Sequence, residues 1–248
     1  MKRLDDRVGV VTGGSRGLGR AIAIEAAREG ARVVVGYRRR ERDASATVEE
    51  IGELGKNAIA LSLDVREAAS VDAFFARVLD AHGRVDGLVT SAGIVLDAWA
   101  ATLPLDQWDD TIATNLRGTF LCARAALRPM MAQKRGSIVA LASVAGLHAS
   151  PGQASYAASK GGILALVRTL AAEVGRHGVR VNALAPGVID AGMVKATSQE
   201  RVQALRDRVP LGRLGEASEI AKCATFLLSD DAGYVTGHTL VADGGMSA

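Results

Sequence analysis

The stretch VGVVTGGSRGLG, residues 8–19, joins a short apolar run to a turn rich in glycine. Valine is enriched in β-strands, so the apolar run is predicted to form a buried strand. The residues that follow, GRAIAIEAAREG (19–30), have the apolar spacing of a helix. The stretch therefore predicts a strand, a tight turn and a helix in succession, which is typical of α/β folds.

The same alternation of strand and helix continues along all 248 residues. Glycines at 30, 55, 83 and 178 fall where the intervening helices should end. No linker divides the chain and no internal repeat is present, so residues 1–248 are predicted to form one α/β domain with a parallel sheet covered on both faces. The predicted strands are residues 8–12, 32–36, 58–63, 87–93, 137–143, 179–186 and 238–245.

The composition is that of an ordinary globular protein. Lys and Arg total 30 against 27 Asp and Glu, giving a net charge of +3, which argues against a nucleic-acid partner. No signal peptide is recognised, and no apolar stretch reaches the roughly 18 residues that cross a bilayer. Cys122 and Cys223 lie in apolar helical segments and are predicted to be reduced. We expect a soluble, cytoplasmic protein with no membrane partner and no metal site.

The glycine turn is a candidate cofactor site, because open parallel sheets bind ligands beyond the carboxyl ends of their strands. Gly13, Gly17 and Gly19 would let the backbone approach a diphosphate, whose charge the next helix N-terminus favours. Their G-x-x-x-G-x-G spacing differs from the G-x-G-x-x-G of the general dinucleotide fingerprint. Glycine turns also serve packing, but this position favours dinucleotide binding.

The stretch GYRRRER (36–42) places four arginines just after the second predicted strand. An acidic residue about 20 positions after the glycines would bind the ribose 2′-hydroxyl of NAD, yet no carboxylate precedes Glu41. Guanidinium groups bind phosphate bidentately, so Arg16 and Arg38 are predicted to recognise a 2′-phosphate, favouring NADP(H) over NAD. The other three arginines, Arg39, Arg40 and Arg42, are more simply explained as solvated charges at the start of a helix. Arg39 nevertheless stays a candidate cofactor contact.

The stretch SYAASKGG (155–162) carries the clearest chemical pattern. Tyr156 and Lys160 are four residues apart, so on a helix both side chains share one face. Ser143 ends the preceding predicted strand. A Tyr–Lys pair alone proves little, but its combination with Ser143 and the glycine turn indicates a catalytic site.

These features together make the chain resemble the short-chain dehydrogenase/reductase family over essentially its whole length. The resemblance implies a single Rossmann-type, doubly wound domain with a seven-stranded, mostly parallel sheet and helices on both faces. It also implies hydride transfer to or from nicotinamide, and a homotetramer. The matching motifs are TGGSRGLG (12–19), Asp64-Val65, TSAG (90–93), Asn115, Ser143, Tyr156, Lys160, Pro186-Gly187 and TGHTLVADGG (236–245).

The resemblance further implies which residues form the site. Asn115 joins Ser143, Tyr156 and Lys160 as a catalytic residue. Two departures from the family pattern lie nearby: Thr90-Ser91 where two asparagines are usual, and Ala191 where threonine is frequent. The implied cofactor contacts are Gly13, Ser15, Arg16, Gly17, Leu18, Gly19, Arg38, Arg39, Asp64, Val65, Ala92, Gly93, Tyr156, Lys160, Pro186, Gly187 and Ile189.

Ketone reduction gives each catalytic residue type a physical role. Tyr156 would be the general acid, and a nearby Lys160 ammonium together with oxidised nicotinamide would lower its pKa from the ordinary value near 10. Ser143 would donate a hydrogen bond to the substrate oxygen. Lys160 would also hold the nicotinamide ribose, and in family terms Asn115 anchors a water that passes protons to Lys160.

The substrate is predicted from overall resemblance to the family's 3-oxoacyl-[acyl-carrier-protein] reductases. His148 and Gln153 are expected, with Ser143 and Tyr156, to line the substrate side, and residues 188–211 to form a short lid. An acidic acyl carrier protein would be the partner, docked by basic residues near the mouth of the site, for which Lys134, Arg135, Arg176 and His177 are candidates.

Two other interpretations stay open. Relatives of this kind also reduce other ketones, including polyketide, sugar, steroid-like and xenobiotic compounds. A Rossmann protein that senses NADP without catalysis is the alternative from another class, although such a protein has no chemical need for all four catalytic residue types.

Overall fold

Seven strands form one parallel sheet in the order β3-β2-β1-β4-β5-β6-β7. The computed structural model describes residues 2–191 and 199–248. The predicted α/β fold is confirmed, and every described strand pair is parallel. The strands are β1 Val8–Thr12, β2 Arg32–Tyr37, β3 Ala58–Ser62, β4 Gly87–Thr90, β5 Gly136–Leu141, β6 Val179–Pro186 and β7 Thr239–Ala242.

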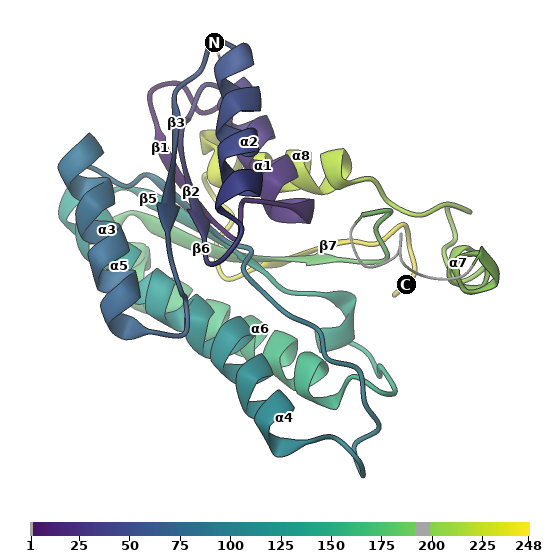
Figure 1. Ribbon diagram of the computed structural model, residues 1–248. Coiled ribbons are helices and arrows are strands. Elements are labelled where there is room, and N and C mark those ends of the chain that lie inside the picture. Colours follow the sequence, from purple (N-terminus) through teal and green to yellow (C-terminus); the bar gives the residue numbers. More distant parts are fainter. Residues whose placement is uncertain (1, 192–198) are drawn as a thin grey trace.

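Helices cover both faces of the sheet, which explains the continuously apolar strands (Figure 1). One face packs against α1 (Gly17–Arg28), α2 (Glu41–Glu53) and α8 (Ala217–Leu228). The other face packs against α3 (Ala68–His82), α5 (Gly118–Gln133) and α6 (Ala154–Val174). Each layer has its own apolar core, with all five residues of β1 buried between them.

Shorter elements connect the strands and the long helices. A π-helical turn, Ile112–Arg117, joins α4 (Leu105–Thr111) to α5 without a break. A 3₁₀ turn, Val144–Gly146, follows β5, and α7 spans Gln199–Arg206. The predicted lid, residues 188–211, lies partly outside the described residues.

Glycines end elements where the sequence indicates. Gly30, Gly55, Gly83 and Gly178 have φ values of 103°, 68°, 71° and 72°. These are left-handed conformations that glycine adopts without steric cost, so each allows the chain to leave a helix and turn towards the next strand.

The parallel strands sort the connecting segments onto two edges. Segments that leave strands gather at the carboxyl edge, and segments that return from helices gather at the amino edge. Lys134, Arg135, Arg176 and His177 follow α5 and α6 and precede β5 and β6, so they lie at the amino edge. Within this chain they therefore lie at the opposite edge of the sheet from Ser143, and their docking of a carrier protein stays a prediction.

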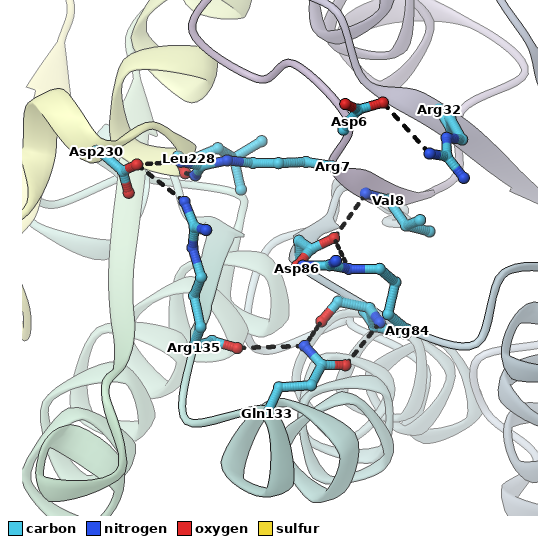
Figure 2. A network of polar contacts seen from close by, with 11 residues as sticks. Asp6, Arg7, Val8, Arg32, Arg84, Asp86, Gln133, Arg135, Leu228 and Asp230 are labelled. Atoms are coloured by element: carbon cyan, nitrogen blue, oxygen red, sulfur yellow. Dashed lines mark hydrogen bonds and ion pairs between the residues drawn. The ribbon is translucent and has the colours of Figure 1, made fainter.

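Arg135 instead belongs to a network of ion pairs at the amino edge (Figure 2). Its Nη2 lies 2.9 Å from Asp230 Oδ2, and Arg7 Nη2 approaches the same oxygen at 2.5 Å. Arg7 also donates to the Leu228 carbonyl at 2.9 Å. These contacts join the start of β1, the start of β5 and the end of α8.

The same network contains a buried carboxylate, Asp86, just before β4 (Figure 2). Asp86 Oδ2 accepts hydrogen bonds from the Val8 amide at 2.9 Å and from Arg84 Nε at 2.8 Å. Because a buried carboxylate needs such partners, this residue joins β1 to β4 at the centre of the sheet.

In the part of the chain that the structure describes, no helix is both long enough and apolar enough to cross a membrane.

We predict that Asp86→Ala lowers the free energy of unfolding by about 2 kcal/mol, because it leaves the Val8 amide without its buried partner. Urea unfolding followed by circular dichroism measures this change. The control is Arg3→Ala, which removes an exposed ion pair of 3.4 Å to Asp231 and should cost less than about 0.5 kcal/mol. Equal losses in the two variants would contradict a central role for Asp86.

Candidate active site

The glycine turn packs tightly against the segment that follows β4. Gly13 has φ +66°, and a Cβ on this residue would lie 2.8 Å from Ala92 Cα. A Cβ on Gly19 would lie 2.3 Å from the Gly13 carbonyl oxygen. Both distances are too short for any other residue, so the turn needs glycine at these two positions. Gly17, with φ +56°, faces open space instead.

The turn leads into the N-terminus of α1, which is suited to an anion. Arg16 adopts an extended backbone, and among the described residues no side chain caps this helix end. Its first turn also carries no acidic side chain. Ser15 is buried and Leu18 is half-buried, so side chains do not crowd the exposed Gly17. The free amides of a helix N-terminus, beside an open glycine, fit a diphosphate group.

Residues predicted to bind the adenosine end lie side by side beyond β2 and β3. Arg38 and Arg39 are exposed after β2, and Asp64 is half-buried after β3. Arg38 Nη1 lies 4.0 Å from Asp64 Oδ2. Val65 is buried, and a Cβ on Gly118 would lie 2.7 Å from its Cγ2, so this valine packs on the start of α5.

Segments beyond β4 and β6 extend the same edge. The Ala92 amide donates to Thr12 Oγ1 at 3.2 Å, and Gly93 lies close to both Asn115 and Lys160. Further along the edge, Pro186 ends β6, the Gly187 amide donates to the Ala242 carbonyl at 3.0 Å, and Ile189 is buried beside Gly215. The structure thus brings every predicted cofactor residue to the carboxyl edge.

Asn115 lies in the π-helical turn and is fully buried. Its Oδ1 accepts from the Ile94 amide at 2.8 Å. Its Nδ2 donates to the Ile94 carbonyl at 2.9 Å and to Ser159 Oγ at 3.1 Å. Asn115 therefore fixes the segment after β4 to the helix that carries Tyr156. Ser159 and the Ile94 backbone are partners that the sequence pattern does not reveal.

Tyr156 and Lys160 lie together on α6, as their spacing predicts. Lys160 Nζ is 5.6 Å from the centre of the Tyr156 ring and donates to the Leu141 carbonyl at 2.6 Å. Ser143 follows β5, and its Oγ accepts from the Ala145 amide at 3.2 Å. The Ser143 side chain is near enough to the Tyr156 phenol to lower its pKa. The three predicted side chains therefore form one cluster.

Burial sets the proton affinities of this cluster. The pKa of Lys160 falls from 10.5 to about 8, because the ammonium is removed from water. The pKa of Tyr156 is raised, chiefly by burial, while the hydrogen bond with Ser143 lowers it and the charge of Asp97 raises it. The sequence predicted a lowered tyrosine pKa. That prediction is for a phenol beside oxidised nicotinamide; in the protein alone, burial outweighs the hydrogen bond with Ser143 and the pKa is raised.

The two residues predicted on the substrate side differ in their surroundings. His148 is exposed in the loop before α6. Gln153 donates from Nε2 to Asp97 Oδ1 at 3.0 Å and accepts at Oε1 from Ser150 Oγ at 2.7 Å. Asp97 was not predicted, since it lies in a separate loop and has no motif around it. The pair joins the loops after β4 and β5 near Tyr156.

Known proteins resemble this chain over nearly its whole length. The family model described as enoyl-(acyl carrier protein) reductase matches residues 13–247. The 3-oxoacyl-[acyl-carrier-protein] reductase FabG of Staphylococcus aureus (strain Mu50) is 41% identical over 237 residues, 96% of each chain. FabG of Escherichia coli K12 is 40% identical over 242 residues, 98% of each chain. The crystal structure of gox2181 matches with a TM-score of 0.95 and 36% identity, over 99% of this chain and 97% of that one.

The chain therefore belongs to the short-chain dehydrogenase/reductase family of oxidoreductases. Within that family it is similar to the two FabG reductases over nearly its whole length.

We predict that Gly146→Ala lowers reductase turnover by at least about tenfold, because small misplacements of reacting groups are costly. A Cβ on Gly146 would lie 2.7 Å from the Lys160 carbonyl carbon and would push the turn after Ser143 away from α6. Initial rates measure the effect. Gly161→Ala is the matched control, since its Cβ would lie at an ordinary 3.5 Å from the Gly146 carbonyl. Equal rates in the two variants would exclude this packing constraint.

Proposed function

We propose that this protein reduces a ketone to a secondary alcohol with NADPH, using Tyr156 as the general acid. The observation that carries the proposal is the cluster of Tyr156, Ser143 and Lys160 beside the glycine turn. The neighbouring hydroxyl groups of Ser143 and Tyr156 would together form a place for one carbonyl oxygen. A buried ammonium 5.6 Å from the tyrosine ring supplies positive charge next to that place.

In this mechanism, the Ser143 and Tyr156 hydroxyls hydrogen-bond to the substrate oxygen. Reduced nicotinamide, when held by the cofactor residues, would supply the hydride for the carbonyl carbon. As negative charge develops on the oxygen, Tyr156 transfers its phenolic proton to it and becomes a tyrosinate. The Lys160 ammonium stabilises that tyrosinate, and the buried setting strengthens the interaction. Asn115 acts as a positioning residue, since it fixes α6 against the segment after β4.

Different residues at the carboxyl edge would hold different parts of the cofactor. The glycine turn and the amides at the start of α1 would bind the diphosphate. Arg16, Arg38 and Arg39 would bind the adenosine 2′-phosphate, which guanidinium groups recognise better than a ribose hydroxyl. Lys160 and the segment that ends at Ile189 would hold the nicotinamide half.

A 3-oxoacyl thioester is the substrate that we propose. The FabG proteins that the chain resembles are named for this reaction, at 40–41% identity over nearly full length. The matching family model is named for an enoyl substrate instead. Paired hydroxyls that hold one oxygen suit a carbonyl group, whereas reducing an enoyl double bond leaves the carbonyl intact. The test therefore includes both substrates, together with other ketones.

We also propose that the 248 residues act as one catalytic domain in a homotetramer, with residues 188–211 as the substrate lid. Exposed apolar side chains support an assembly. Trp108 and Phe120 are exposed on α4 and α5, and Val241 is exposed on the edge strand β7. Such residues on a helix pair and an open sheet edge are suited to contacts between copies.

We predict that the protein oxidises NADPH faster than NADH when acetoacetyl thioester is supplied, and that an enoyl thioester is inert. Initial rates at 340 nm, a standard wavelength for nicotinamide, give both comparisons. Comparing carrier-protein and pantetheine thioesters shows whether a carrier contributes.

In Tyr156→Phe, NADPH binding should persist while turnover falls at least about a hundredfold. Near-normal turnover in that variant would remove Tyr156 from the mechanism.

The reduction rate is predicted to decline as pH rises through about 8, where the Lys160 ammonium loses its proton. The sign follows from its role, because the charged form below this pKa is the one that stabilises tyrosinate. Tyr156 itself stays protonated there, since burial raises its pKa. The turnover number at saturating cofactor, measured from neutral to alkaline pH, checks this. A profile that stays flat well above pH 8 would contradict it.

A further inference from the structure

The proposed 2′-phosphate site contains a carboxylate that should oppose an anion. Asp64 Oδ2 lies only 4.0 Å from Arg38 Nη1. A negative charge at this distance would attract the arginine away from a phosphate and would repel the phosphate itself. A site that selects NADPH therefore has to compensate the charge of Asp64.

Arg66 holds this carboxylate from the other side. Its Nη2 donates to Asp64 Oδ2 at 2.8 Å, and its Nε donates to Asp64 Oδ1 at 3.1 Å. The Arg66 backbone amide donates to the same Oδ1 at 3.1 Å. Arg66 thus makes three hydrogen bonds to Asp64, whereas Arg38 only approaches it.

The contact with Arg66 lowers the proton affinity of the Asp64 carboxylate. The pKa of this carboxyl is lowered, first because of the hydrogen bonds from the Arg66 side chain, while the charge of Arg38 is a smaller cause. Bidentate pairing of this kind is the strongest ion-pair geometry that arginine forms. The carboxylate is therefore ionised at neutral pH, and most of its compensation comes from Arg66.

Contacts on its far side hold Arg66 in this position. Its Nη1 lies 3.3 Å from Asp110 Oδ1 on α4. Arg117, at the end of the π-helical turn, donates to the Arg66 carbonyl oxygen. Both partners belong to the continuous helical segment that also carries Asn115, so Asp110 holds the Arg66 guanidinium and Arg117 holds the Arg66 backbone.

We propose that Arg66 determines cofactor specificity without touching the cofactor, by binding Asp64 and so leaving Arg38 free for the 2′-phosphate of NADPH. Arg66 is accordingly a positioning residue, and the inference rests on the proposed use of NADPH. Without Arg66, the nearest cation to Asp64 is Arg38. The two would pair, and the site would lose a phosphate ligand and gain an uncompensated negative charge.

The test is direct binding of NADPH and NADH, measured by nucleotide fluorescence, which does not depend on the ketone. Arg66→Gln should weaken NADPH about tenfold and change NADH less than about twofold, because only NADPH carries the extra phosphate. Asp64→Asn combined with Arg66→Gln should restore the ratio of NADPH to NADH affinity to within about threefold of the original protein, since no carboxylate remains to compete for Arg38 and a lost adenosine contact weakens both cofactors alike.

Arg40→Gln is the matched control, because it also removes one arginine near the phosphate site. Arg40 pairs with Asp43 at 3.1 Å on the surface, and its loss should leave the ratio of the two affinities unchanged. Circular dichroism melting establishes that each variant is folded.

The outcomes separate the two proposals. Equal weakening of both cofactors by Arg66→Gln, or no recovery in the double variant, overturns the role of Arg66 while leaving the use of NADPH intact. An unchanged protein that binds NADH more tightly than NADPH overturns the proposed cofactor, and this inference with it. Selective loss of NADPH with recovery in the double variant supports both.

Discussion

The parallel direction of all seven strands is the constraint on which the rest of the structure depends. Because every strand ends at the same edge, the turns after β1, β2, β3, β4, β5 and β6 meet there, although their residues are spread from Gly13 to Ile189. Close contact between these turns then requires glycine. A Cβ on Gly13 would touch the segment after β4, and one on Gly146 would touch α6 beside Lys160. The site is therefore assembled by backbone packing before any ligand is considered.

Buried charges at the two edges of the sheet differ in how well neighbouring groups compensate them. At the amino edge, the Asp86 carboxylate accepts hydrogen bonds from Arg84 and from the Val8 amide. Its charge is therefore compensated, and its role is to hold neighbouring strands together. At the carboxyl edge, the Lys160 ammonium is buried with a carbonyl oxygen as its ligand, and its pKa falls to about 8. A charge that is only partly compensated is costly in the folded protein but available to a reacting group. This difference explains why one edge is structural and the other fits catalysis.

The segments proposed to select substrate and cofactor differ in how they are fixed. The cofactor side is held by ion pairs, with Asp64 placed between Arg66 and Arg38. The substrate side is held by hydrogen bonds between loops. One of them joins Gln153, which lies just before Tyr156 in the sequence, to Asp97. Proteins that share the fold and the Tyr–Lys pair differ in such loops, so the family alone does not determine the ketone.

The sequence by itself determined the layered fold and most of the proposed site. Apolar runs alternating with helical spacing specify all seven strands, and Tyr156, Lys160 and the glycines stand in local patterns that physical chemistry can interpret. What only the tertiary structure decided were relations between distant segments. These include the bonds of Asp97 to Gln153 and of Asn115 to Ile94, the amino-edge position of Arg135 and Arg176, and the direction of the Tyr156 pKa. Each depends on which segments become neighbours and how much water they exclude, and no local sequence pattern contains that information.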